Sequence, residues 1–280
     1  MHVRSFLALF LILALAGVAP ASAQQGIDYN VVDVGSPTMV VLVPGAFHCA
    51  EHFAPLQATL AAQGQSSAAI SLRGHCNSPM PPGQVVAQAT LADYVTDVAN
   101  VIESEGWEVV ELWGHSAGSL VIRAYGLTYG TMGGQIVNVV HLAPVPMTPN
   151  RLNALLGYYQ ATFPDAMACF FSTFSMTCLR DPLAATFTNN LSPAQWAPWE
   201  ALLTDDESAE MIVAAQALIG IDAWPATPET IIQPTADRTL PAAFIQEDAA
   251  LIGASLQLIT DGRGHDYWLD LPAPAPAKKR

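Results

Sequence analysis

The sequence predicts an α/β fold, in which helices flank a mostly parallel β-sheet, and three observations lead to this prediction. The run from Thr38 to Val43 (TMVVLV) is apolar and rich in β-branched residues, as expected of a parallel strand that is buried on both faces. Strand and helix patterns alternate from residue 30 to residue 145, which is typical of a parallel sheet. With 280 residues, 51% of them hydrophobic, the chain can bury one large core.

Each predicted element has a local pattern that supports it. Strands are expected over residues 38–43, 67–72, 108–114, 135–145, 229–235 and 255–260, all of them short runs of apolar residues. Helices are expected over residues 51–64, 90–106 and 117–130. In the second of these helices, apolar residues recur with the helical period, at Leu91, Tyr94, Val95, Val98 and Ile102.

The strand–helix alternation breaks after residue 146. Residues 147–228 contain helical stretches but no convincing strand, and they are rich in aromatic residues and methionine. We therefore expect a helical cap that is inserted into the sheet domain and lies over one end of the sheet. The final residues, 273–280, are rich in proline, alanine and lysine and are expected to form a flexible tail.

The first 23 residues have the pattern of a signal peptide. An apolar run from Phe6 to Val18 precedes a small-residue cleavage site, Ala21-Ser22-Ala23. An uncleaved membrane anchor is the alternative, but the run is shorter than the ~20 residues that a membrane span needs. We expect cleavage near Ala23, export to the periplasm or the medium, no membrane span in the mature protein, and a single mature domain over 24–280.

Export would place the four cysteines in an oxidising compartment. Cys49 and Cys76 each follow a predicted strand and could meet at one end of the sheet, and Cys169 and Cys178 could close a short loop. We expect both disulfides, although four buried thiols are the alternative.

Composition also argues against two classes of partner. The net charge of −14 leaves no basic patch for a phosphate backbone, so nucleic acid is not an expected partner. The sequence contains no CxxC, HExxH or cysteine–histidine cluster, so we expect no bound metal.

The candidate for chemistry is Ser116, in the pentapeptide Gly114-His115-Ser116-Ala117-Gly118. The pattern G-x-S-x-G alone is weak evidence, but here it lies where a predicted strand ends and a predicted helix begins. A serine on such a sharp turn needs small neighbours, and its position at a helix N-terminus favours developing negative charge. An ordinary serine in a tight loop is the alternative.

A nucleophilic serine needs a base, and the base needs an orienting acid. His265 follows the last predicted strand in a glycine-flanked loop, at the sheet edge where Ser116 should also lie. Asp237 follows the preceding strand and lies between Ser116 and His265 in chain order. We expect His48 to line the site, His115 to point away from it, and the remaining histidines after the leader to be structural, namely His52, His75 and His141.

These motifs resemble the α/β-hydrolase superfamily over nearly all of the mature chain. The matching stretches are VVLVPGAFHCAEHF, SLRGHCNSP, TLADYVTDV, WGHSAGS, ADRTLP and GRGHDYWLDLP, in the order and at the spacing usual for the family. The loop PGAFHCAEHF is similar to that of small Ser-Asp-His esterases and hydroxynitrile lyases. The resemblance implies an α/β-hydrolase fold with catalytic Ser116, Asp237 and His265, and no cofactor.

The resemblance further implies an oxyanion hole formed by the backbone N–H groups of Ala46 and Ala117, with Phe47 and His48 as candidate pocket-lining residues. The lyases usually carry threonine in place of Gly45 and lysine in place of Asp266, which argues against cyanohydrin chemistry. We therefore expect an exported serine hydrolase that cleaves a small or medium apolar carboxylic ester. The alternatives are amide, lactone or carbon–carbon bond hydrolysis or acyl transfer on the same residues, and a non-catalytic ligand-binding protein.

Overall fold

The computed structural model describes residues 26–146, 149–210 and 227–269. The predicted signal peptide (1–23), the predicted tail (273–280) and parts of the predicted cap (147–148 and 211–226) lie outside the described residues. Within the described ranges, no helix is both long and apolar enough to cross a membrane.

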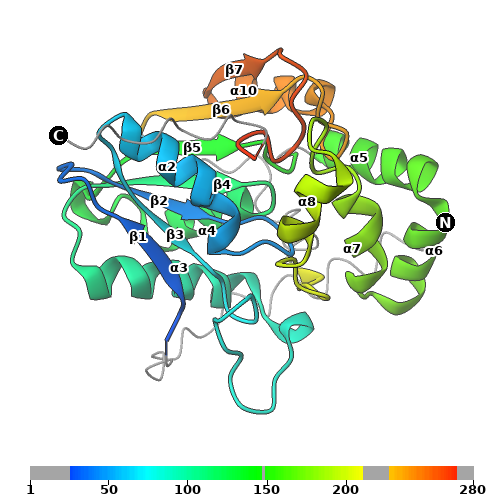
Figure 1. The fold of residues 1–280 in the computed structure, drawn as a ribbon, viewed down its shortest axis with the longest axis horizontal. Helices are drawn as coiled ribbons and strands as arrows, with labels where there is room; N and C mark the ends of the chain where they lie inside the picture. Colours follow the sequence, from blue (N-terminus) through cyan, green and yellow to red (C-terminus); the bar gives the residue numbers. More distant parts are fainter. Residues whose placement is uncertain (1–25, 147–148, 211–226, 270–280) are drawn as a thin grey trace.

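A seven-stranded sheet forms the centre of the molecule, with strand order β1-β3-β2-β4-β5-β6-β7 (Figure 1). Its strands are β1 (Tyr29–Val32), β2 (Met39–Val43), β3 (Ser66–Ile70), β4 (Val110–His115), β5 (Ile136–Leu142), β6 (Glu229–Pro234) and β7 (Ser255–Ile259). Only β1 pairs in antiparallel fashion, with β3; the other neighbours in this sheet are parallel. The predicted fold class is confirmed, and all six predicted strands are present.

Helices cover both faces of the sheet. Strand β2 alternates between the two faces: Val41 and Val43 pack in one apolar cluster, and Val40 and Leu42 pack in another. The first cluster contains the apolar face of α3 (Leu91–Glu105) and residues of α4 (Gly118–Tyr129), and the second contains residues of α2 (Ala54–Ala62). The central strand is therefore buried on both sides, as its composition predicts.

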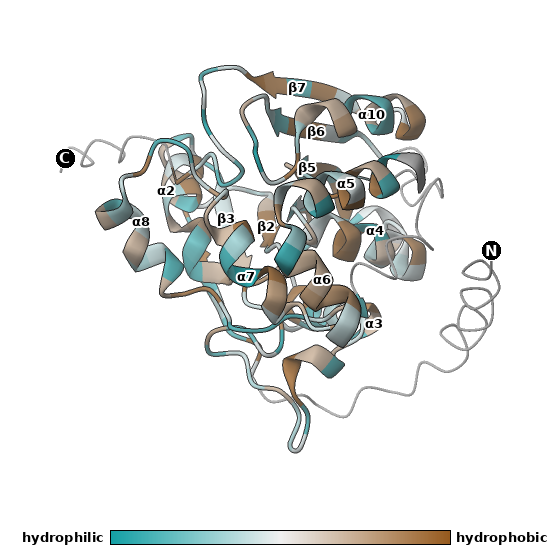
Figure 2. Ribbon diagram, turned by 90° about the vertical axis from the view of Figure 1, so that its right-hand side faces the viewer, coloured by the Kyte–Doolittle hydropathy of each residue, from teal (hydrophilic) through white to brown (hydrophobic). Residues whose placement is uncertain are grey.

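Among the described residues between β5 and β6 there are four helices: α5 (Pro149–Thr162), α6 (Pro164–Thr173), α7 (Thr177–Ala184) and α8 (Pro193–Glu200). They gather beyond the end of the sheet toward which the arrows of β5 and β6 point (Figure 1), and Figure 2 views the molecule from that side. Leu155 and Tyr159 of α5 share an apolar cluster with Leu42 and Leu142 of the sheet. The helices thus cover the carboxyl edge of the parallel strands.

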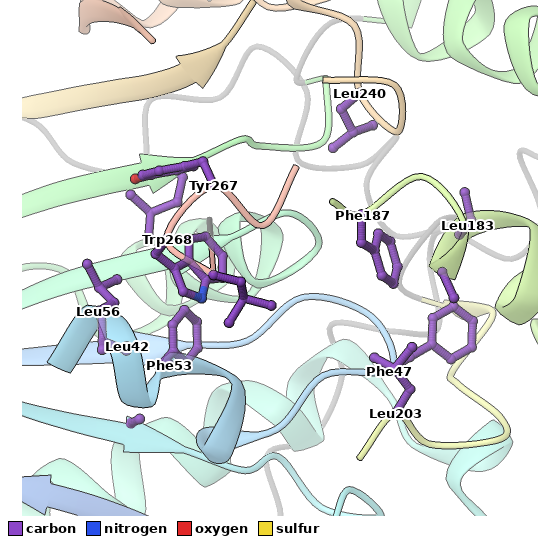
Figure 3. Close-up of a cluster of buried hydrophobic side chains, with 14 of the residues drawn as sticks. Leu42, Phe47, Phe53, Leu56, Leu183, Phe187, Leu203, Leu240, Tyr267 and Trp268 are labelled. Carbon is purple, nitrogen blue, oxygen red and sulfur yellow. The ribbon is translucent and has the colours of Figure 1, made fainter. Parts of the chain in front are cut away.

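The remaining elements of the described ranges are short and connect the main ones. They are α10 (Gln246–Ile252) and four 3₁₀ turns, η1 (Ala50–Phe53), η2 (Val86–Gln88), η3 (Met132–Gly134) and η4 (Ala242–Phe244). After β7 the chain returns to the core, where the buried ring of Trp268 stacks on Phe53 at 5.2 Å between centroids (Figure 3). The Trp268 indole N–H donates to the carbonyl of His52 at 2.9 Å, which fixes the segment that carries His265.

Candidate active site

Ser116 lies on the sharp turn between β4 and α4, as its sequence context predicts. Its φ is +49°, in the left-handed region that residues other than glycine rarely adopt. A Cβ at Gly114 would come within 2.7 Å of the Gly118 carbonyl oxygen, and a Cβ at Gly118 would come within 2.4 Å of the Val43 carbonyl oxygen. Both glycines are therefore required, because the turn leaves no room for a side chain on either side of the serine.

Ser116 opens onto a cavity of about 60 Å³ between the sheet edge and the cap. Ala46 and Ala117 line the same cavity, which places the two predicted oxyanion donors beside the serine. The other lining residues are almost all apolar: Val145, Leu152, Leu155, Leu156, Tyr159, Met176, Leu179, Leu183, Phe187, Thr239 and Leu240. Because Ala117 is the N-cap of α4, its N–H is one of the helix donors that have no partner within the helix.

The structure joins His265 and Asp237, the other two predicted residues. Nδ1 of His265 lies 2.8 Å from Oδ2 of Asp237, and both side chains are buried. The second oxygen, Oδ1, accepts hydrogen bonds of 2.8 Å from the backbone N–H groups of Thr239 and Leu240. The carboxylate is thus held in place from both sides, and it holds the imidazole in the tautomer with a proton on Nδ1.

Two opposing effects set the proton affinity of His265. Burial disfavours the charged imidazolium, but the Asp237 carboxylate and, to a smaller extent, the Asp266 carboxylate together outweigh this effect, so the pKa of His265 lies above its ordinary value. Nε2 of His265 makes no hydrogen bond within the described part of the chain, so no bond joins it to Ser116. The ring nevertheless lies close to the serine turn, 4.6 Å from the ring of His115 between centroids. Catalytic hydrogen bonds often tighten only when substrate binds.

The loop that carries Ala46 is a tight turn. The N–H of His48 donates to the carbonyl of Gly45 at 3.2 Å, and Phe47, the third residue of the turn, has a φ of +68°. A positive φ at this position is the mark of a type II turn, which usually has glycine there. Phe47 is held in this conformation because its N–H donates to Glu207 at 3.0 Å and its carbonyl accepts from the N–H of Thr204 at 2.9 Å.

Two predictions about this turn are wrong. Phe47 and His48 are both buried, at 0% and 1% exposure, and neither lines the cavity. The turn directs Phe47 into the apolar cluster beside Leu203 (Figure 3) and directs His48 toward Asp266. Their position in the loop indicated proximity to the serine but not the side on which each ring packs.

The other histidines after the leader are buried, as core residues are. His115 does not line the cavity, as expected, and its ring packs edge-on against Trp268 at 4.5 Å. His141 bonds Glu229 at 3.0 Å, and His52 bonds the carbonyl of Trp199 at 3.0 Å. His75 bonds Glu207 at 2.8 Å.

Glu207 is a residue that the sequence does not reveal. It is buried, and its carboxylate also accepts a 2.7 Å hydrogen bond from the hydroxyl of Tyr94. Since it lies in the acidic run Asp205-Asp206-Glu207, it resembles a solvated side chain, and no local pattern distinguishes it from its neighbours.

The predicted cysteine pairs are both present as disulfides. Cys49 joins Cys76, with 6.1 Å between the Cα atoms, and Cys169 joins Cys178, with 5.8 Å between the Cα atoms. The first disulfide lies next to the turn that carries Ala46, and the second lies in the cap.

Two groups of side chains in the described part of the chain offer donor atoms that could suit a metal ion, and one of them, Cys49, Glu51 and Cys76, has its two sulfur atoms joined in a disulfide. Within the described residues, His48, His115 and Asp266 have one donor atom each within 4.8 Å of one another, all buried. Two of these atoms already form a hydrogen bond, because Nε2 of His48 lies 2.9 Å from Oδ2 of Asp266. This spacing is that of a hydrogen-bonded pair.

Comparison with known proteins agrees with the fold. Residues 40–276 match the α/β-hydrolase family. No curated protein sequence matches the chain closely enough to count as a relative.

Solved structures resemble the chain at low sequence identity. A monoacylglycerol lipase from Paleococcus ferrophilus has a TM-score of 0.62 and 20% identity, over 86% of this chain and 90% of the lipase. An esterase from Exiguobacterium antarcticum has a TM-score of 0.62 and 18% identity, over 88% and 91% of the two chains. A bromoperoxidase from Bacillus anthracis has a TM-score of 0.62 and 16% identity, over 85% and 88%. At these identities the likeness concerns the fold.

The family match covers most of the chain, and the sheet order, the strained serine turn and the His265–Asp237 pair agree with it. The chain therefore belongs to the α/β-hydrolase family.

Proposed function

We propose that the chain is a serine hydrolase that cleaves a carboxylic ester of a small or medium apolar substrate through an acyl-enzyme on Ser116. One observation carries this proposal: Ser116, on a strained turn at a helix N-terminus, shares a cavity with Ala46 and Ala117. A hydrogen-bonded His265–Asp237 pair lies beside the same turn. This arrangement supplies a nucleophile, two oxyanion donors, a base and an orienting acid.

The reaction follows from these positions. His265 removes the proton of Ser116 through Nε2 as the hydroxyl attacks the ester carbonyl, and Asp237 stabilises the imidazolium that forms. The N–H groups of Ala46 and Ala117 stabilise the oxyanion; each such donor is worth roughly 3 kcal/mol in the transition state. His265 then protonates the leaving alcohol. A water molecule that His265 deprotonates attacks the acyl-enzyme, releases the acid and restores Ser116.

The lining of the cavity supports an apolar acyl group as the part of the substrate that binds there. No charged side chain lines this cavity within the described residues, and leucines from α5 and α7 form much of its wall. An ionised acyl group would lose its hydration without finding a partner, which is costly. Neutral aliphatic esters should therefore be better substrates than esters of dicarboxylic acids.

Export also forms part of the proposal. Two disulfides close loops within the described chain, which is usual for proteins that fold in an oxidising compartment. They support the expectation that residues 1–23 are a signal peptide that is removed before the mature protein acts.

The proposal can be tested with a panel of p-nitrophenyl esters of increasing acyl length, assayed with the mature wild-type protein and with Ser116→Ala. Loss of the nucleophile should lower turnover on the order of 10⁶-fold. The matched control is Ser119→Ala, because Ser119 is buried in the first turn of α4, three residues after Ser116, and its hydroxyl donates to the carbonyl of Gly114 at 2.8 Å. Ser119→Ala should keep most of the activity.

The alternatives predict different outcomes. If the wild type hydrolyses lactones, amides or carbon–carbon bonds but not simple esters, and Ser116→Ala abolishes that reaction, then the serine mechanism stands and the ester assignment is wrong. If wild type and Ser116→Ala are equally inactive and a fluorophosphonate does not label Ser116, then the protein is not a serine hydrolase.

A further inference from the structure

Three buried titratable groups close to the site have no part in the proposed reaction: His48, His115 and Asp266. Asp266 follows the proposed base directly in the chain, and its side chain is fully buried. While His265 faces Asp237, Asp266 extends to His48, and its Oδ1 lies 3.4 Å from Nε2 of His115. Carboxyl groups are rarely buried without a partner, and Asp266 is buried beside the proposed base although it does not line the cavity.

The hydrogen bonds of His48 use both of its ring nitrogens. Nδ1 lies 2.7 Å from the carbonyl oxygen of Ala46, which can only accept, so Nδ1 carries a proton. Nε2 lies 2.9 Å from Oδ2 of Asp266, and a second proton must lie between these two atoms for the hydrogen bond to exist. His48 therefore links the carbonyl of Ala46 to the side chain of Asp266 through both ring nitrogens.

His48 also restrains the peptide groups on both sides of Ala46. Its backbone N–H holds the carbonyl of Gly45, which belongs to the same peptide group as the N–H of Ala46. Its side chain holds the carbonyl of Ala46 itself. The orientation of the proposed oxyanion donor is thus set by two hydrogen bonds from one residue, in a turn that also carries the strained Phe47.

The other end of the link holds the segment of the base. The N–H of Asp266 donates to the carbonyl of Phe187 at 2.8 Å, and the ring of Phe187 stacks on the ring of His265 with 5.7 Å between centroids. The N–H of Leu269 donates to the carbonyl of Asp266 at 2.8 Å. Asp266 is therefore fixed through its backbone as well as its side chain, and it cannot move without moving His265.

We propose that His48 and Asp266 are positioning residues that join the oxyanion turn to the loop of the catalytic base and fix the distance between them. This inference rests on the proposed serine mechanism, and it adds the link that aligns the oxyanion turn with the loop that carries His265. Transition-state stabilisation depends on donors that are already in place, so loss of the link should reduce the rate of chemistry more than the binding of substrate.

Substitutions at His48 and Asp266 can distinguish a role in aligning the site from a role of the Asp266 carboxylate charge and from a role in folding. His48→Ala and Asp266→Ala each break the link, and we expect kcat to fall about 10²-fold, as displacements of about 1 Å can cause. KM should change by less than about twofold. Asp266→Asn can still donate to a neutral His48, and kcat should stay within about fivefold of wild type, as expected when a charged hydrogen bond becomes a neutral one.

Two milder variants guard against a failure to fold. His48→Asn can place an amide N–H near the position of Nδ1 and keep the bond to Ala46, whereas His48→Gln can reach toward Asp266 and give up that bond. Each should lower kcat less than His48→Ala does. His141→Asn is the matched control. It also removes a buried histidine that bonds a carboxylate, because His141 lies 3.0 Å from Glu229, but this pair lies within the sheet and not at the site. It should affect thermal stability and leave kcat near that of wild type.

The rate at which a fluorophosphonate labels Ser116 gives a second readout, since it uses the oxyanion hole without requiring turnover of an ester. Slower labelling in His48→Ala and Asp266→Ala, with normal labelling in Asp266→Asn, supports the inference. Wild-type kcat and labelling in folded His48→Ala and Asp266→Ala overturn it, and so does an equal loss in Asp266→Asn and Asp266→Ala. Failure of the proposed function would show instead as a wild-type protein that neither turns over esters nor reacts with the probe.

Discussion

The two walls of the cavity are built in different ways. On the sheet side, Ser116 and Ala46 lie on turns that contain residues with positive φ. Hydrogen bonds hold the backbone groups of these turns, and one of the partners is the buried carboxylate of Glu207. On the cap side, leucines of α5 and α7 contribute apolar surface. The difference indicates that reaction chemistry is fixed on the rigid sheet edge, whereas substrate choice depends on cap side chains that can vary with little effect on the chemistry.

After the loss of Ser116 itself, the largest expected effect comes from the rigid wall, at Asp237. Asp237→Asn should lower kcat about 10⁴-fold, because asparagine favours the wrong tautomer of His265. The pKa of His265 is raised, and the base acts in its neutral form, so the acid limb of the kcat/KM profile should lie above pH 6.5 in the wild type. A pH series should show this limb move to lower pH in Asp237→Asn. A limb that stays in place would mean that another group titrates there.

The two disulfides allow the sheet wall and the cap wall to be compared in their contribution to stability, because one disulfide lies next to the oxyanion turn and the other lies in the cap. Cys49–Cys76 closes a loop of 27 residues and Cys169–Cys178 a loop of 9. From loop entropy, their removal should cost about 3.6 and about 2.6 kcal/mol of unfolding free energy. Urea unfolding of Cys49→Ser/Cys76→Ser and of Cys169→Ser/Cys178→Ser measures both costs. Only the first pair adjoins the oxyanion turn, so only its loss should also lower kcat. If both double variants lost kcat equally, the chemistry would not depend on the sheet wall alone.

The cap wall can be tested with two buried leucines of one apolar cluster. Leu183 and Leu203 are both labelled in the cluster of Figure 3, but only Leu183 is among the residues that line the cavity. Leu183→Ala should shift the preferred ester toward longer acyl chains, with a change of about tenfold in the ratio of kcat/KM values. Leu203→Ala should cost about 2–5 kcal/mol in stability, as buried leucines do, without that shift. An identical chain-length profile for all three proteins would show that this cavity does not bind the acyl group.

The smallest expected effect concerns His75, behind the rigid wall. Burial disfavours its charged form, but the Glu207 carboxylate outweighs burial, so the pKa of His75 is raised above 6.5. A raised folded-state pKa means that the pair stabilises the protein fully below pH 6.5 and loses this contribution as pH rises through the folded pKa. The difference in unfolding free energy between wild type and His75→Gln should therefore shrink with rising pH. A constant difference would show that the charge on His75 does not contribute.

The sheet and its serine turn can be predicted from sequence because their causes are local. A buried parallel strand needs an apolar run such as TMVVLV, and the turn at Ser116 needs glycine two positions away on each side. Strand β1 is not evident, since it is a short edge strand and none of its four residues is fully buried.

The support behind the site depends instead on contacts between distant parts of the chain. Glu207 bonds Phe47 and His75 across 160 and 132 residues, and His48 bonds Asp266 across 218 residues. No local pattern encodes such contacts. For the same reason the sequence placed Phe47 and His48 near the serine but could not tell that their side chains are buried behind the cavity.

In the proposed mechanism, Ser116 carries the acyl group during turnover. The most direct measurement is mass spectrometry of the protein after acid quench during reaction with a p-nitrophenyl ester, followed by digestion to locate the adduct. We predict an acyl group on the peptide that contains Ser116, formed together with a burst of p-nitrophenol. Hydrolysis with no adduct on Ser116, or with the adduct on another residue, would contradict the account.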